Sequence, residues 1–318
     1  MSDARTTLFG SESQQALRVP LIVAPMFLVT GPDLVIAACK AGAIGAIPAL
    51  NARTPALLDE WLAKIVGALD STHDAAFAVN LIAHPTNSRL EEDLAVTEKH
   101  RVPIVITSVG APDKVVSRIH RYGGVVLGDV ASVKHARKAL AAQVDGLVLL
   151  CAGAGGNTGS LNPFAFLEAV RKFYDGVIVV AGGITSGRQI RALQMLGADF
   201  AYVGTPFIVA AESQAPASYR RALIEAGIDD IACTTAITGI PTNVLRACLE
   251  RLQIPEQGGL GVGDMDTARK PWLLDVWAAG HGVGQVDSET TVAIIVERFR
   301  EEFASTRFGP AGPGRASC

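Results

Sequence analysis

Short apolar runs recur along the first two thirds of the chain, and an amphipathic stretch follows each of them. The runs are nearly continuous in Val, Ile, Leu and Ala, which is typical of strands buried on both faces of a parallel sheet. We predict eight strands, at residues 21–24, 43–47, 77–81, 103–107, 125–128, 146–151, 177–181 and 200–204.

The stretches between these runs have the polar and apolar spacing of helices. We predict helices at residues 32–41, 55–69, 88–100, 112–122, 132–142, 163–173, 186–196 and about 215–227. Several begin with Pro after a capping residue, as in Thr54-Pro55 and Asn162-Pro163. Strict alternation of eight strands with eight helices predicts an α/β fold, a TIM (β/α)8 barrel, with an open doubly wound sheet as the alternative.

The pattern changes from about residue 229 onward. Residues 231–245 are free of charge and rich in Thr, a helix is predicted at 243–252, a Gly-rich loop at 255–263, and a closing helix at 291–303. We therefore predict a barrel of residues 1–228 and a helical appendage of residues 229–304 that folds over the barrel mouth. Residues 305–318 are rich in Gly and Pro and are expected to form a disordered tail.

The composition narrows the class of protein. Of 318 residues, 49% are hydrophobic but only 6% aromatic, 19% are charged, and the net charge is −3. Such a chain is neither a disordered protein nor a coiled coil, and it has no basic clusters of the kind that bind nucleic acid. The longest charge-free run, residues 146–167, is broken by glycines, asparagines and a proline, so no membrane span is expected. Five cysteines without CxxC spacing and a polar N-terminal stretch favour a reducing, cytoplasmic location.

Two glycine motifs end the last two predicted strands, Gly182-Gly183 and Gly204-Thr205. Glycine at such turns lets backbone N–H groups approach an anion, and the loops after the last two strands of a TIM barrel commonly bind phosphate. The alternative is that both motifs are simply tight turns.

A third glycine-rich segment follows the sixth predicted strand, at residues 151–159. It includes Ala154, Gly155 and Gly156, and Asn157 is its first polar side chain. Four glycines between Gly153 and Gly159 exceed what flexibility needs, so we expect a flat ligand to lie against this backbone, with Asn157 facing the substrate.

Four further features are candidates for ligand contacts. Ala24-Pro25-Met26 offers a soft surface for a ring system, although core packing is the alternative. Asn80, in an apolar strand, is either a structural bridge or a ligand donor, and Asp129 is either a helix cap or a ligand residue. His281 lies in another Gly-rich loop and is a candidate substrate residue, whereas no His or Cys pair has metal-ligand spacing, so no metal site is expected.

Together these residues resemble the nitronate monooxygenase (2-nitropropane dioxygenase-like) family, to which the FMN-dependent enoyl-acyl-carrier-protein reductases are related. The resemblance runs from Val19 to about Phe303, and the order and spacing of its motifs make it specific. The motifs are Ala24-Pro25-Met26, Val79-Asn80-Leu81, residues 152–156, residues 181–184, residues 203–207 with Glu212-Ser213, and residues 279–283.

The resemblance implies a TIM barrel that binds FMN without a covalent bond at its C-terminal face. It assigns Gly182, Gly183, Gly204 and Thr205 to the FMN phosphate. Pro25, Met26 and Asn80 would line the isoalloxazine ring, Gly155 and Gly156 would lie beside it, and Asp129 would meet the ribityl hydroxyls. The neighbouring Ala24, Ala154 and Ala181 complete this implied cofactor-binding set.

The departure from the family pattern is Asn157, because studied members have His there, in an Ala-Gly-Gly-His-x-Gly arrangement. An Asn amide forms hydrogen bonds but is no general base near neutral pH. We therefore expect oxidation of anionic nitronates rather than of neutral nitroalkanes.

These observations favour an FMN-dependent oxidoreductase that oxidises alkyl nitronates, with a small-molecule substrate and O2 as co-substrate. One alternative is an NAD(P)H-dependent reductase of quinones or enoyl thioesters. Another is a non-catalytic flavin-binding protein, and a third is a colourless phosphate-sugar isomerase on the same barrel. No nucleic-acid or membrane partner is expected, and the sequence leaves open whether the chain forms a homodimer.

Overall fold

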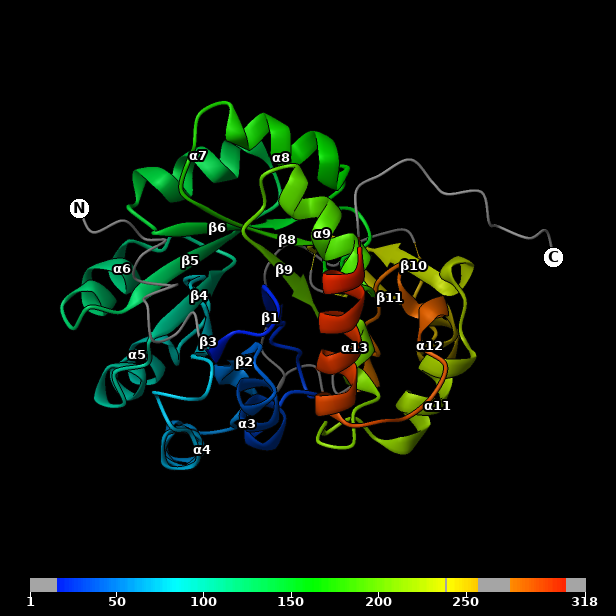
Figure 1. Cartoon of the computed structure of the whole chain (residues 1–318), viewed down its shortest axis with the longest axis horizontal. Helices are drawn as coiled ribbons and strands as arrows, with labels where there is room; N and C mark the ends of the chain where they lie inside the picture. Colours follow the sequence, from blue (N-terminus) through cyan, green and yellow to red (C-terminus); the bar gives the residue numbers. More distant parts are fainter. Residues whose placement is uncertain (1–15, 238, 257–274, 307–318) are drawn as a thin grey trace.

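The computed structural model describes residues 16–237, 239–256 and 275–306. Eight parallel strands close into a barrel, which confirms the predicted TIM-barrel fold (Figure 1). In barrel order the strands are β1 (Leu21–Val23), β2 (Ile44–Pro48), β3 (Phe77–Ile82), β4 (Ile104–Ser108), β5 (Val125–Val130), β6 (Gly146–Leu150), β8 (Val177–Ala181) and β9 (Phe200–Val203).

Helices surround the barrel and pack their apolar faces against the strands. Side-chain caps start several of them, since Thr54 accepts a hydrogen bond from Leu57 N, and Asn162 accepts one from Phe164 N. The helices that follow the first seven barrel strands are α3 (Pro32–Lys40), α4 (Pro55–Ala68), α5 (Leu90–Lys99), α6 (Asp113–His120), α7 (Val133–Ala141), α8 (Pro163–Arg171) and α9 (Gly187–Met195).

The eighth outer position is filled by α13 (Val292–Ser305), which lies between α9 and α3 (Figure 1). Phe299 of this helix stacks on Phe207, with ring centroids 6.3 Å apart. The expected eighth helix, α11 (Ala217–Glu225), instead packs beside the short helix η4 (Val283–Gln285), away from the barrel wall. Both helices are amphipathic and follow the last barrel strand, so the pattern of apolar residues does not distinguish them.

Between α10 (Thr205–Ile208) and α13 the chain forms a cap beside the barrel mouth, and this cap contains strands besides the helices and loops that we expected. It contains β10 (Ile231–Thr234), β11 (Thr242–Leu245) and α12 (Arg246–Leu252). The helix predicted from residue 243 begins only at Arg246, because the preceding residues, two of them β-branched, pair with β10 as an antiparallel strand. Residues 257–263 of the predicted loop and residues 307–318 of the predicted tail lie outside the described part of the chain.

Side chains that point into the barrel stack in layers, because alternate residues of a strand face the same side. In β5, for example, Leu127 belongs to the interior cluster, and Asp129 is the next inward position toward the C-terminal end. The uppermost inward layer, which we call the cavity floor, consists of Ala24, Pro48, Asn80, Ser108, Asp129, Leu150, Ala181 and Tyr202.

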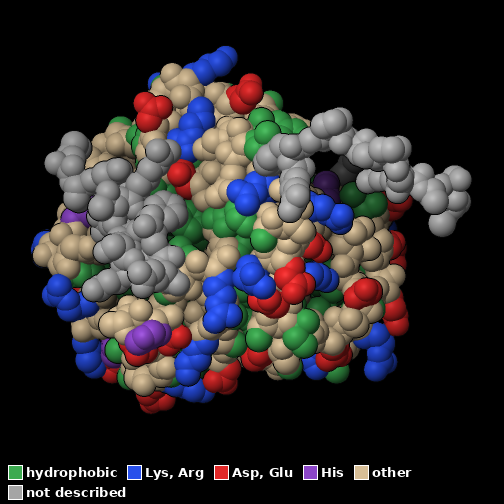
Figure 2. Space-filling view, viewed as in Figure 1, with side chains coloured by type: hydrophobic (Ala, Val, Ile, Leu, Met, Phe, Trp, Pro, Cys, Tyr) green, Lys and Arg blue, Asp and Glu red, His purple; other side chains and the backbone are tan. Residues whose placement is uncertain are grey.

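The outer surface is of mixed charge. On the face shown in Figure 2, acidic and basic side chains are interspersed rather than gathered by sign. Among the described residues, no helix is both long enough and apolar enough to cross a membrane.

Candidate active site

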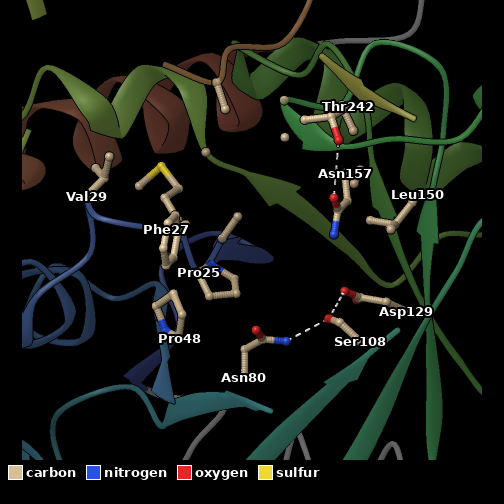
Figure 3. Close-up of a pocket in the computed structure, with 18 of the residues that line it drawn as sticks. Pro25, Phe27, Val29, Pro48, Asn80, Ser108, Asp129, Leu150, Asn157 and Thr242 are labelled. Atoms are coloured by element: carbon tan, nitrogen blue, oxygen red, sulfur yellow. Dashed lines mark hydrogen bonds between the residues drawn. The ribbon is translucent and has the colours of Figure 1, made fainter. Parts of the chain in front are cut away.

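A cavity of about 560 Å³ lies at the C-terminal mouth of the barrel, above the cavity floor and beside the cap (Figure 3). The structure brings nearly all of the predicted site residues to its lining. These are Ala24, Pro25, Met26, Asn80, Asp129, Ala154, Gly155, Gly156, Asn157, Ala181, Gly182, Gly183, Gly204 and Thr205.

A chain of hydrogen bonds crosses the polar half of the cavity floor. Asn80 Nδ2 donates to Ser108 Oγ at 2.7 Å and to the Ile106 carbonyl at 3.1 Å. The Ser108 hydroxyl in turn donates to Asp129 Oδ2 (Figure 3). Ser108 escaped the sequence reasoning, although its place two residues after buried Ile106 is the signal that it faces inward.

Asp129 and Tyr202 each leave one buried atom without a partner. Among the described residues, neither Asp129 Oδ1 nor Tyr202 Oη has a hydrogen-bond partner. Burial raises the pKa of Asp129 to about 7, against the opposing effect of the Ser108 hydrogen bond. Burial, and then the Asp129 charge, raise the pKa of Tyr202 well above its ordinary value. The alternative that Asp129 caps a helix is wrong, because Ser132 caps α7.

Backbone without side chains forms one wall of the cavity. A Cβ atom on Gly155 would lie 2.8 Å from Gly280 N, and Gly182 has a φ of +136° that L side chains rarely adopt. Gly183, with a φ of +65°, opens toward space, since a Cβ there would meet nothing nearer than His281 Cβ at 4.0 Å. A ligand can therefore contact the backbone atoms of this wall directly.

The loop after β6 is tied to the loop before η4 through one carbonyl group. Gly153 O accepts hydrogen bonds from Gly183 N at 3.2 Å and from His281 N at 3.0 Å. The Gly183 N–H is therefore engaged within the protein rather than free for an anion, which corrects the expected role of that amide. Thr205 Oγ1 accepts a hydrogen bond from Gly280 N at 3.0 Å and keeps its own hydrogen to donate.

The structure does not bring His281 to the cavity. Its side chain is exposed, and the residue does not contribute to the lining, so the prediction of a substrate contact is corrected. Its ring lies instead beside Gly153, and its Cβ faces Gly183, at the edge of the glycine wall.

Asn157 reaches the cavity from a two-residue strand, β7 (Gly156–Asn157), which pairs with β11 of the cap. Thr242 Oγ1 lies 3.5 Å from Asn157 Oδ1, within hydrogen-bond reach (Figure 3). Next to it, Asn243 Nδ2 donates to Ala154 O at 2.8 Å. Pairing of β7 with β11 thus positions the backbone of Asn157, which we predict to face the substrate, against the cap.

A buried amide outside the cavity lining holds the loop that carries Pro25 and Met26. Asn51 Nδ2 donates to Met26 O and Thr30 O, both at 2.9 Å, and Asn51 Oδ1 accepts from Leu28 N at 3.0 Å. Leu28 has a left-handed φ of 62°, which such a clamp can sustain. No motif in the sequence pointed to Asn51.

The cap contributes an apolar wall opposite the polar part of the floor. Tyr219 stacks on Trp277 with ring centroids 5.4 Å apart, and its hydroxyl donates to Ala278 O. The wall's cavity-lining members from the cap are Tyr219, Ile237, Val276 and Ala278, and Val29 of the loop after β1 and Ile208 of α10 continue the wall.

Two arginines stand in the cavity lining near β2 and α5. Arg53 is exposed, whereas Arg89 is held by Asp93 Oδ1 at 2.7 Å and by Ala52 O at 2.7 Å. Within the described ranges, no cluster of His, Cys, Asp or Glu has the arrangement of a metal site.

The nitronate monooxygenase family model matches residues 82–258. The chain therefore belongs to the nitronate monooxygenase family, whose members are oxidoreductases.

The curated relatives include dehydrogenases of a CoA ester and nitronate monooxygenases. A (3aS,4S,5R,7aS)-5-hydroxy-7a-methyl-1-oxo-octahydro-1H-indene-4-carboxyl-CoA dehydrogenase of Mycobacterium tuberculosis is 29% identical over 238 residues, covering 74% of this chain. The match spans 65% of that dehydrogenase, slightly less than two thirds of its length. A nitronate monooxygenase of Paraburkholderia phytofirmans is 28% identical over 268 residues, covering 69% of this chain and 71% of that protein.

Solved structures share the whole architecture. Nitroalkane oxidase from Streptomyces ansochromogenes has a TM-score of 0.80 and 26% identity, over 95% of this chain and 98% of that one. FabK from Thermotoga maritima has a TM-score of 0.78 at 23% identity, over 96% of each chain, and supports the fold alone.

Proposed function

We propose that this protein is an FMN-dependent oxidoreductase that oxidises alkyl nitronates with O2. The observation that carries the proposal is that one cavity joins a wall of bare backbone to a polar floor with two unpartnered buried groups, Asp129 Oδ1 and Tyr202 Oη. A flat cofactor needs a wall of backbone without side chains to lie against. The hydroxyl groups of a ribityl chain would form hydrogen bonds with the unpartnered Asp129 Oδ1 and Tyr202 Oη.

The residues of the cavity fit FMN. Gly182, Gly204 and the Thr205 hydroxyl would hold the phosphate, and Gly183, whose N–H is taken up by Gly153 O, would only lie against it. A Cβ on Gly204 would already meet Met26 Sδ at 3.3 Å. The ring system would lie between the Pro25–Met26 loop and the Gly155–Gly156 backbone, beside Ala154. When bound, FMN supplies the two-electron redox chemistry, and the protein supplies binding, orientation and exclusion of water.

His281 belongs to the phosphate end of this proposed arrangement. Its Cβ lies 4.0 Å from where a Cβ of Gly183 would be, and its N–H fixes the Gly153 carbonyl. Its role there would be to hold the glycine wall in place, not to contact substrate.

Asn157 would orient the substrate without moving a proton. Its amide offers one acceptor and two donors, and its NH2 group would bind the oxygens of a nitronate anion. A nitronate already lacks the carbon-bound proton that a neutral nitroalkane must lose. The absence of a base at residue 157 therefore limits the reaction to the anion.

A second candidate is redox chemistry on an acyl or enoyl thioester, including NAD(P)H-dependent reduction. Two observations favour it, the apolar wall of the cap and the exposed Arg53 guanidinium in the lining, which would attract the phosphates of a CoA ester. The curated dehydrogenase relative acts on a CoA ester by its name.

The absorbance spectrum of the purified protein tests the cofactor. Flavin bands, present at once or after addition of FMN, are expected, and their absence would contradict both candidates. Anaerobic mixing then separates the two, because nitronate is expected to bleach the flavin faster than NAD(P)H does. A yellow protein that neither reagent bleaches would support a non-catalytic role, and faster turnover of the neutral nitroalkane than of its anion would contradict the role of Asn157.

A further inference from the structure

The two unpartnered groups of the cavity floor differ in what they can do. Tyr202 and Asp129 both bury a polar atom without a partner among the described residues. Tyr202 can only donate or accept a hydrogen bond near neutral pH, because its pKa is raised well above the ordinary value. Among the described residues that line the cavity, Asp129 carries the one carboxyl group, and so it can add or remove a full negative charge there.

We propose that Asp129 takes up a proton from solvent when negative charge develops on the bound cofactor, and releases it when that charge is removed. This inference rests on the FMN site of the proposed function. In the balanced step, two electrons come from the reducing substrate, one proton goes to the cofactor, and a second proton converts the Asp129 carboxylate to the acid. When O2 reoxidises the cofactor, both electrons pass to O2, and the cofactor and Asp129 each release their proton.

The neighbours of Asp129 leave its charge without compensation. The cavity floor places Ser108 of β4, Asn80 of β3, Leu150 of β6, Ala181 of β8 and Tyr202 of β9 around it, and none of these side chains is a cation.

The other ionisable groups near Asp129 do not compensate its charge. Cys151, which follows β6, donates its thiol to Leu149 O, and burial raises its pKa to about 12. Of the two arginines in the described lining, Arg89 is paired with Asp93, and Arg53 is exposed to solvent.

Like charges close together oppose each other's ionisation. Burial, opposed by the Ser108 hydrogen bond, already brings the pKa of Asp129 to about 7 in the ligand-free protein, so additional negative charge above the floor raises it further. Over a range of pH above neutrality, Asp129 is then ionised beside the oxidised cofactor and protonated beside the reduced one.

Ser108 determines the pH range over which Asp129 takes up the proton. Because Ser108 Oγ accepts a hydrogen bond from Asn80, its own hydrogen is directed at Asp129 Oδ2, where it stabilises the carboxylate. Removing this hydroxyl therefore moves the proton uptake to higher pH while the carboxyl group stays in place.

The test is the midpoint potential of bound FMN, followed from about pH 6 to about pH 9 with dithionite as reductant. The proteins to compare are the FMN-loaded wild type, D129N, S108A and Y202F. The wild type is expected to take up one more proton per two electrons than D129N, so that its potential falls more steeply by about 30 mV per pH unit over part of this range. S108A is expected to show the steep segment at higher pH than the wild type. Y202F is expected to take up the same additional proton as the wild type.

Three outcomes would contradict the inference in separable ways. If D129N binds FMN and its potential follows the wild-type slope at every pH, Asp129 is not the proton acceptor and the FMN site stands. If D129N does not bind FMN, an S108A profile that coincides with the wild type overturns the inference. If the wild type itself binds no FMN, the proposed function fails together with the inference.

Discussion

The Ser108 hydroxyl donates to Asp129 Oδ2 across neighbouring strands, and it is the one hydrogen bond that this carboxyl group receives from the described residues. Ser108 is itself oriented by Asn80, so three successive barrel strands share one polar chain. The other carboxyl oxygen is left buried and free. This asymmetry is why the carboxyl group is costly to ionise without a ligand.

The ligand-free protein should therefore lose stability as Asp129 ionises. Its pKa is 3.8 in the unfolded chain and about 7 in the folded one, so the stabilising contribution is complete below about pH 4 and is lost as the pH rises through about 7. D129N cannot ionise, so its free energy of unfolding relative to wild type should increase between these limits, by at most about 4 kcal/mol. Urea unfolding of both proteins across this pH range measures the trend.

Substituting the open glycine of the wall should weaken FMN binding. Gly183→Ala adds a Cβ where nothing lies within about 4.0 Å, so the methyl group would occupy space meant for the ligand. We expect at least about a tenfold loss of FMN affinity, roughly 1.4 kcal/mol. Gly123→Ala is the matched control, because Gly123 also has a positive φ and open space but lies outside the cavity. Equal FMN affinity in the two variants would count against the wall as a cofactor site.

A histidine at position 157 should restore proton transfer. Asn157→His places a group with an ordinary pKa of about 6.5 in the lining, so activity on neutral nitroalkanes should rise with pH through that range, while activity on nitronates changes little. Asn157→Gln keeps an amide and serves as the control. The prediction would fail if the ratio of the two activities were the same in both variants.

The Asn51 clamp should matter for the cavity as well as for stability. Asn51→Ala removes three hydrogen bonds and leaves buried backbone groups unpaired, at a cost of about 2–4 kcal/mol. Because the clamped loop carries Pro25 and Met26, FMN affinity and the shape of its absorbance bands should change too. Asn162→Ala removes a helix cap worth about 1 kcal/mol far from this loop, and its flavin spectrum should remain that of the wild type.

Two helical glycines should respond to alanine in opposite directions. At Gly187, the first residue of α9, a Cβ would lie 2.0 Å from Phe299 O, so Gly187→Ala must push α13 away and should cost more than about 3 kcal/mol. Gly67 in α4 has nothing within 4 Å, and Gly67→Ala should stabilise by about 0.5–1 kcal/mol. Thermal unfolding of the two variants gives the comparison, and a tolerated Gly187→Ala would show that the α9–α13 contact is loose.

The barrel was predictable because each of its strands is a continuous apolar run, and the site glycines were predictable because they end those runs. Ser108 and Tyr202 were missed because a Ser and a Tyr at a strand end carry no signal without knowing which face points inward. Asn51 was missed because its partners are backbone groups some twenty residues away, at Met26, Leu28 and Thr30. The small sheet of β10, β11 and β7 was missed because β7 is two residues long and gains its strand character from pairing with β11.

The chain leaves and re-enters the barrel at almost one point. Ala211 N donates to Thr290 O at 2.8 Å, and Thr290 N donates to Val209 O at 3.4 Å, so the intervening segment starts and ends side by side. In topological terms the entire cap is a single enlarged connection between β9 and α13. A connection with adjoining ends can be exchanged without reopening the barrel. The charged groups of the cavity floor and the shape of the apolar wall can thus change independently of each other. Asn157 is the exception, because it lies on a barrel loop but pairs with the cap, so a different cap would have to fit against it.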